Sequence, residues 1–515
     1  MKTSNSGSNN TGGSVPIKER ALVLQGGGSL GAYEAGAYKA LYKWLTDKDE
    51  KDEQGARPIF DIVAGTSIGA MNAAVLTSYV VENETYEGSS DRLIEFWHYL
   101  SKQSTIDKNP FFKKWWDQWN HVSKTVATGE AARRYYSAKE FALLGVPNVF
   151  APLTPTFDTR FFDTSNVWYR FSNTPLKRSL EKFCKFPIAT SQENNQPRLI
   201  LVAVDVAEGL PVTFDSYPKE DGSRKTEYGK VIQGEDGDLG FEHVIEYNDG
   251  ITADHVIASG SFPVNFDYAR LDVASYRSDG TKNENGFKTS IGKKNSDVIH
   301  KNTISKSNSK SVLNDERYSL EKRYFWDGGL LSNTPLTQLV LLHRRYWYFQ
   351  RGLKDKVPTL AVCAINVHPN KQKEIPMDRD GVLSRNADIS FSDRSHRDEE
   401  VLLLISDYVH LIRELVKTAK DGGISDETIN NLMNQRTISH GQDIKARRYR
   451  EIVEGRFDIS EIYRIEKQTN QDTIADKTFD FSSGTIQELL NEGYRDAMRY
   501  IEGYVRPKIS KVKSV

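Results

Sequence analysis

Cysteine is scarce in this chain, because 515 residues contain only Cys184 and Cys363, which lie far apart among apolar neighbours. This scarcity excludes a disulfide-rich scaffold and a cysteine-ligated metal site, since both need several cysteines at characteristic spacings. We therefore expect both thiols to be reduced and buried. The sequence predicts no metal and no other cofactor.

Long apolar runs are also missing. No stretch reaches the roughly 18–20 apolar residues that cross a bilayer. Residues 1–18 are rich in Ser, Asn and Gly and lack the apolar segment of a secretory signal. We expect a disordered tail at 1–18 and a cytoplasmic protein that meets a membrane, if at all, at its surface.

Neither sign of charge dominates the composition. Lys and Arg number 69 against 70 Asp and Glu, so the net charge is −1. This balance gives no bulk attraction to nucleic acid or to an anionic membrane, and no nucleic-acid partner is predicted. A chain of 515 residues exceeds what one hydrophobic core usually supports, so we expect a main domain with insertions or a second domain.

The most informative motif is G-T-S-I-G at 65–69, which directly follows the apolar run 59–64. A strand, a tight turn around a serine and a following helix form a nucleophile elbow, which exposes the serine hydroxyl at the helix N-terminus. The next apolar residues follow a helical period: Ile68, Met71, Val75, Leu76, Tyr79 and Val80. We therefore predict Ser67 as a nucleophile, with Gly65 and Gly69 letting strand and helix approach closely.

A second glycine cluster lies upstream, between a predicted strand at 21–25 and a predicted helix at 31–45. It consists of Gly26, Gly27 and Gly28. Such a loop exposes backbone N–H groups, and the following helix adds the positive end of its dipole, so an anion is favoured there. The oxyanion of an acyl-transfer reaction at Ser67 is such an anion.

The same letters fit the dinucleotide-binding pattern G-x-G-x-x-G through Gly26, Gly28 and Gly31. In that fold the next strand ends in an acidic residue that binds the ribose hydroxyls. Here the acid, Asp61, lies near the start of the next strand. The dinucleotide reading is therefore the less favoured one.

The third motif is D-G-G at 327–329, which follows the apolar residues 324–326. A serine esterase needs a base for its nucleophile, and an aspartate on a tight turn after a strand holds a carboxylate in a fixed position. Asp327 is one way to supply this base, with Gly328 and Gly329 forming the turn.

In this order the three motifs resemble those of the patatin-like phospholipase family over roughly residues 20–370. Residues 258–266 are similar to the family's A-S-x-x-x-P-x-x-F segment. The resemblance implies a three-layer α/β/α domain with a mostly parallel central sheet. It also implies a serine–aspartate dyad of Ser67 and Asp327, with an oxyanion hole made by the glycine loop and the amide of Ile68. The substrate would be a lipid or another acyl ester.

One residue departs from the family pattern, because Leu30 stands where the glycine loop commonly carries Arg or Lys. Leucine donates no hydrogen bond and neutralises no charge. If position 30 contacts a headgroup, the departure predicts a weaker preference for anionic phospholipids.

Two alternatives remain open on the residues alone. A Ser-Asp-His triad would need a histidine after Asp327. The candidates are His343, His368, His396, His410 and His440. Of these, His368 ends a predicted strand at 359–367 and is the one to test. The second alternative is a lipid- or partner-binding protein that keeps the fold without catalysis.

We expect the catalytic domain at 19–370, interrupted by a helical cap insertion at 84–165 and a flexible polar loop at 276–319, and then a helical C-terminal region at 371–515. The cap is rich in aromatic residues. Four of them flank two lysines and are predicted to contact lipid: Phe111, Phe112, Trp115 and Trp116.

Overall fold

The computed structural model describes residues 15–51, 58–104, 129–153, 171–233, 239–277, 315, 317–353, 357–372, 374–392, 395–437, 448–468 and 474–512. Most of the predicted tail at 1–18 and of the predicted polar loop at 276–319 lies outside these ranges. The four predicted lipid contacts, Phe111, Phe112, Trp115 and Trp116, lie outside them as well.

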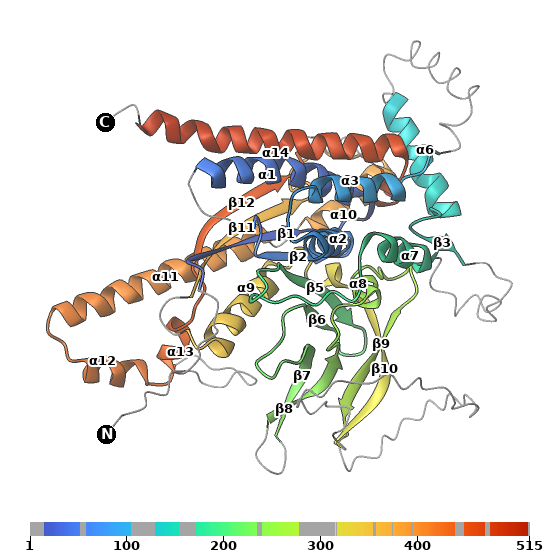
Figure 1. The fold of residues 1–515 in the computed structure, drawn as a ribbon. Helices are drawn as coiled ribbons and strands as arrows, with labels where there is room; N and C mark the ends of the chain where they lie inside the picture. The colour runs from blue at the N-terminus through green and yellow to red at the C-terminus, as the bar shows by residue number, and fades with distance from the viewer. Residues whose placement is uncertain are drawn as a thin grey trace.

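A ten-stranded sheet forms the centre of the molecule (Figure 1), in the order β12-β11-β1-β2-β5-β10-β9-β8-β7, with β6 paired to β5. Its strands are β1 (Lys18–Leu24), β2 (Ile62–Thr66), β5 (Arg198–Asp205), β6 (Leu210–Asp215), β7 (Lys225–Gln233), β8 (Leu239–Glu246), β9 (Ala269–Tyr276), β10 (Tyr318–Asp327), β11 (Thr359–Asn366) and β12 (Ile459–Glu466). The pairings from β12 to β5 are parallel, and the others are antiparallel. The predicted α/β fold is confirmed, with a mixed sheet in place of a mostly parallel one.

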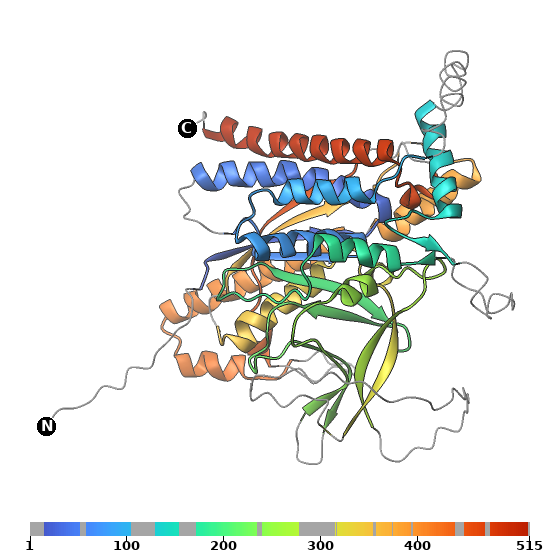
Figure 2. The same cartoon turned by 45° about the vertical axis from the view of Figure 1, so that its right-hand side comes forward.

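Helices cover both faces of the parallel part of this sheet (Figure 2), so the alternating side chains of β1 are buried on both sides. Leu22 and Leu24 join the core on one face, and Ala21 and Val23 join the core on the other. The first face packs against α1 (Gly31–Lys51), α2 (Ile68–Asn83), α3 (Ser89–Leu100), α7 (Thr174–Phe183), α8 (Ala253–Ser259) and α14 (Ser483–Val512). The second face packs against α9 (Leu336–Arg344) and α11 (Ser395–Asp421).

The structure also contains α6 (Gly129–Leu144), α10 (Arg379–Phe391), α12 (Asp426–Met433), α13 (Tyr449–Val453) and the two-stranded sheet of β3 (Ala151–Pro152) and β4 (Phe171–Ser172). No helix in the described ranges is long and apolar enough to cross a bilayer.

The predicted cap insertion is in part a component of the main core. Its first helix, α3, packs on α1 and α2, and its residues Phe96 and Trp97 have no exposed surface. These two aromatic side chains are therefore structural.

The predicted helical C-terminal region also contributes to the central sheet. Its strand β12 pairs in parallel with β11, and Ile459, Tyr463 and Ile465 point into the cores. The long helix α14 lies along α1 (Figure 1). Two glycines make this approach close, because a Cβ on Gly36 would lie 1.9 Å from the Leu490 carbonyl oxygen and one on Gly493 would lie 2.0 Å from that of Tyr33.

Candidate active site

The site lies where two strands meet end to end. β2 pairs with residues 198–202 of β5, and β10 pairs with residues 203–205 in the opposite direction. Because β6 occupies the other edge of β5 along 200–205, β2 and β10 must share one edge. The C-terminal ends of β2 and β10 therefore meet. Ser67 directly follows β2, and Asp327 is the last residue of β10, so the two residues lie together.

The turn at Ser67 has the backbone of a nucleophile elbow. Ser67 adopts φ 56° and ψ −125°, a region that costs a non-glycine residue roughly 1–3 kcal/mol. A Cβ at Gly65 would lie 2.2 Å from the Gly69 carbonyl oxygen, and one at Gly69 would lie 2.5 Å from that of Leu24. Both flanking glycines are thus required by close backbone contact.

The segment 258–266 supports this strained turn. The amide of Ser67 donates to Ser259 Oγ at 2.9 Å, and Ser259 donates in turn to the Val202 carbonyl at 2.6 Å. The amide of Asp327 donates to the Ser261 carbonyl at 3.0 Å. One short segment therefore holds the backbone of both Ser67 and Asp327.

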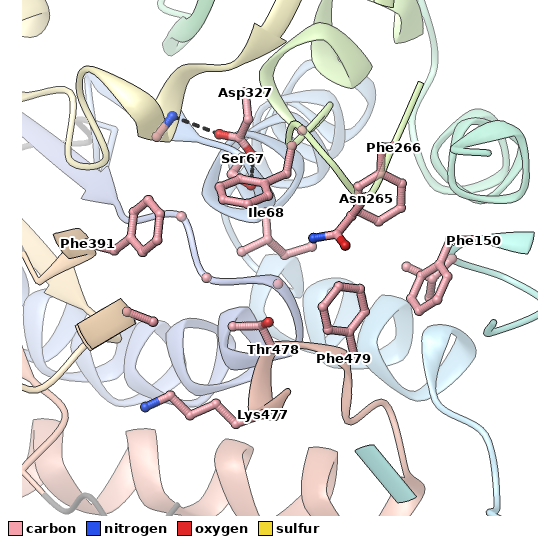
Figure 3. A pocket seen from close by; sticks show the side chains of 18 of the residues that line it. Ser67, Ile68, Phe150, Asn265, Phe266, Asp327, Phe391, Lys477, Thr478 and Phe479 are labelled. Atoms are coloured by element: carbon pink, nitrogen blue, oxygen red, sulfur yellow. Dashed lines mark hydrogen bonds between the residues drawn. The ribbon is translucent and has the colours of Figure 1, made fainter. Parts of the chain in front are cut away.

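Ser67 and Asp327 are in direct contact (Figure 3). Ser67 Oγ donates to Asp327 Oδ2 at 2.5 Å, and the Gly329 amide donates to Asp327 Oδ1 at 2.7 Å. Burial raises the pKa of the Asp327 carboxyl from 3.8 to about 7, although both hydrogen bonds oppose that shift. Asp327 is therefore a carboxylate with the proton affinity of a base that works near neutral pH.

The glycine loop lies beside Ser67, and its three amides differ. The Gly26 amide donates to the Asn333 carbonyl at 3.2 Å, so it is engaged within the protein. The amides of Gly27 and Gly28 have no acceptor among the described residues. Gly28 has φ +57°, and a Cβ there would lie 2.5 Å from the Thr478 carbonyl oxygen, so only glycine fits.

Ser67, Asp327 and the glycine loop line a cavity of about 320 Å³. One wall of the cavity is aromatic (Figure 3). The ring of Phe150 lies 5.7 Å from that of Phe266 and 5.6 Å from that of Phe479. Ile68, Met71 and Leu176 extend this apolar lining.

Sequence reasoning missed one part of the cavity, which comes from the C-terminal region. Residues 475–479 line it, and Lys477–Phe479 form a short 3₁₀ turn. No motif identifies these residues, because their role depends on a long-range approach to the glycine loop. The expected role of Leu30 also changes, since this side chain is 2% exposed and lies outside the cavity, in a small hollow beside Arg134.

None of the histidines in the described residues hydrogen-bonds to Ser67 or Asp327. His343 is buried with Nε2 3.0 Å from Glu19 Oε2, and His410 bonds to Asp458 at the surface. His368 lines the cavity, but its Nδ1 lies 3.1 Å from Asp388 Oδ1. The His396 side chain and the whole of His440 lie outside the described structure.

One group of side chains in the described residues has the composition of a metal site, namely Glu208, Glu242 and His243, with ligand atoms within 4.8 Å of one another. A guanidinium nitrogen of Arg323 lies 2.9 Å from Glu208 Oε1, so a cation already balances this group. It lies on the antiparallel part of the sheet, and none of its members lines the cavity at Ser67.

Three comparisons with known proteins were informative to different degrees. The family model described as patatin-like phospholipase matches residues 22–340. Among solved structures, the crystal structure of VipD from Legionella pneumophila aligns over 95% of this chain and 67% of that chain, with 12% sequence identity. Its TM-score is 0.27, too low for the two sites to be compared. A search of curated protein sequences finds no match.

Proposed function

Because the chain belongs to the patatin-like phospholipase family, we propose that it is a lipid acyl hydrolase that uses Ser67 and Asp327 as a catalytic dyad. The contact of 2.5 Å between Ser67 Oγ and Asp327 Oδ2 carries this proposal. The apolar cavity at the same point suits the acyl chain of a lipid ester.

The reaction has two halves. Asp327 takes the proton of Ser67 while Oγ attacks the acyl carbonyl carbon, and the oxyanion is stabilised by the amides of Gly27, Gly28 and Ile68. The alcohol leaves with the proton from Asp327, and the acyl group stays on Ser67. Water then loses a proton to Asp327, attacks the acyl-serine and releases the fatty acid, after which Ser67 regains its proton.

The two alternative functions explain fewer of these contacts. A binding protein has no need for a strained serine hydrogen-bonded to a buried carboxylate of raised pKa. A dinucleotide site needs a free acid at the second strand, whereas Asp61 Oδ2 accepts the Arg20 amide at 2.7 Å. Hydrolysis is therefore the favoured function.

The decisive experiment is to incubate the purified protein with a panel of phospholipids, lysophospholipids, glycerides and simple acyl esters. Released fatty acids and lyso products are identified by mass spectrometry. Hydrolysis of at least one lipid class, absent in Ser67→Ala, supports the proposal. Release of no product from any ester by a folded wild-type protein would contradict it.

Activity should depend on pH through the Asp327 carboxyl. Its pKa is raised to about 7, so the base is largely protonated in acid and ionises as the pH rises through 7. We expect kcat/KM to rise with unit slope up to pH 7 and then level, about 100-fold above its value at pH 5. A profile measured on a soluble ester checks this, and a flat profile from pH 5 to pH 8 would exclude a base with this pKa.

The aromatic wall should limit the acyl chains that are accepted. Phe479→Ala enlarges the cavity, so kcat/KM for longer acyl groups should rise relative to shorter ones, by about fourfold for each extra methylene that becomes buried. Phe349→Ala is the control, because that ring is 61% exposed and outside the cavity. A series of esters of increasing chain length gives the ratio, and identical chain-length profiles for both variants would contradict this role of Phe479.

A further inference from the structure

We propose that His368, Asp388 and Lys477 form a positioning network, through which the C-terminal region sets the geometry of the glycine loop. This inference rests on the proposed function, because the loop matters as an oxyanion site. None of the three residues belongs to the motifs at 26–31, 65–69 and 327–329, and all lie beyond residues 22–340 that match the family.

Asp388 is the centre of the network. It comes from α10 and has no exposed surface. Lys477 Nζ donates to its Oδ1 at 2.6 Å, and His368 Nδ1 lies 3.1 Å from the same atom. Three elements far apart in the chain therefore converge on one carboxylate: the end of β11, α10 and the 3₁₀ turn at 477–479.

Opposite charges hold these three side chains together. Burial opposes ionisation of Asp388, but the bond to His368 and the charge of Lys477 outweigh it and hold the pKa of Asp388 below its usual value. Burial lowers the pKa of His368, so its ring is neutral at neutral pH. Loss of the Lys477 charge would leave the Asp388 carboxylate buried without its cation, which is strongly destabilising for the local arrangement.

The network touches the glycine loop from two sides. On one side, the Lys477 carbonyl accepts from Ser29 Oγ at 2.9 Å, and Thr478 packs against Gly28. On the other, His368 Nε2 would lie 3.4 Å from a Cβ on Gly27.

The glycine loop needs this support because it forms few hydrogen bonds of its own that would fix its conformation. The Gly27 and Gly28 amides have no acceptor among the described residues, and Gly28 has positive φ. An oxyanion donor contributes to catalysis only when it is fixed at the position where charge develops. Lys477 and His368 clamp the loop without contacting Ser67, so we assign them a positioning role.

The test is Lys477→Met, which keeps the unbranched side chain up to Cε and removes the charged amino group. We expect kcat on a soluble ester to fall 10- to 100-fold while KM stays within threefold, and fluorophosphonate labelling of Ser67 to slow by the same factor. Lys477→Arg should recover part of the loss. Lys322→Met is the matched control, since Lys322 forms an exposed ion pair with Asp272, and it should leave both rates unchanged.

Two further measurements separate a folding defect from a loss of positioning. If Lys477→Met does not fold, the pair Lys477→Met with Asp388→Asn removes both buried charges, and its kcat should remain low. Hydrogen exchange of the peptide spanning 25–32 should be faster in either variant, whether or not a substrate is known. A folded variant with kcat within threefold of wild type, or with unchanged exchange, would overturn the inference. Failure of wild type to hydrolyse any lipid would instead count against the proposed function.

Discussion

Ser67→Ala should fold normally and lose at least about 10⁴-fold in turnover of any ester that the wild-type protein hydrolyses. The nucleophilic oxygen is then absent, so no acyl-enzyme can form, and only the oxyanion site and the cavity remain to assist water. Covalent labelling by a fluorophosphonate, followed by peptide mass spectrometry, should report Ser67 in wild type and no site in the variant.

Alanine at position 67 removes the hydrogen bond to Asp327 Oδ2 but keeps the backbone contact that holds the turn. The bond from the amide of residue 67 to Ser259 Oγ persists, since it involves only the backbone at 67. Circular dichroism and the melting temperature should therefore match those of wild type. Labelling that persisted in Ser67→Ala would identify a different nucleophile.

Asp327→Asn should lower kcat by about 10³- to 10⁴-fold, because the amide cannot accept the Ser67 proton. The substitution keeps the shape of the side chain. Its oxygen can still accept the Gly329 amide, and its nitrogen can donate to Ser67 Oγ. Kinetics on a soluble ester, together with intact folding, therefore report the missing base alone.

The stability of Asp327→Asn relative to wild type should depend on pH. The unfolded carboxyl releases its proton near pH 3.8, whereas the folded one holds it to about pH 7. Folding is thus weakened as the pH rises between these values, by up to about 4 kcal/mol at alkaline pH. Asparagine carries no such cost, so Asp327→Asn should melt higher than wild type at pH 8 and show little of this gain at pH 4.

A histidine variant separates the dyad from a triad. If His368 were the base, His368→Gln would lose as much activity as Asp327→Asn. We expect a smaller loss, of the size given above for the positioning network. A loss of 10³-fold or more in His368→Gln, with Asp327→Asn active above 1% of wild type, would favour the triad.

The parts of the site that could be predicted are those that are local in sequence. The elbow at Ser67 needs a strand, two glycines and a helix within about twenty residues, and each leaves a pattern of its own. Asp327 could be predicted because a turn motif marks the end of its strand. The contact between Ser67 and Asp327 is geometrical, however, and depends on β2 and β10 sharing one edge of β5.

Other features left no local pattern. Strand β12 lies between charged helices, and its side chains alternate only partly between buried and exposed. The aromatic and basic residues at 477–479 look like surface sequence until α14 and α1 bring them to the glycine loop. The family pattern, with Arg or Lys at position 30, points to a headgroup contact there, but the 3₁₀ turn at Gly28–Leu30 directs Leu30 into the interior.

The hairpin of β9 and β10 has a consequence for how the protein can be altered. Tyr276 faces Tyr318 at its outer end, while Asp327 is the last residue of β10. Ten residues of extended chain put about 30 Å between that outer end and the carboxylate. Arg277, at the end of the described chain after β9, donates its amide to the Arg317 carbonyl beside this outer end. A shorter connection or an inserted reporter domain between residues 277 and 315 would therefore be separated from Asp327 by the full length of a strand. The connection between β9 and β10 can thus change in length without moving Asp327 at the other end of β10.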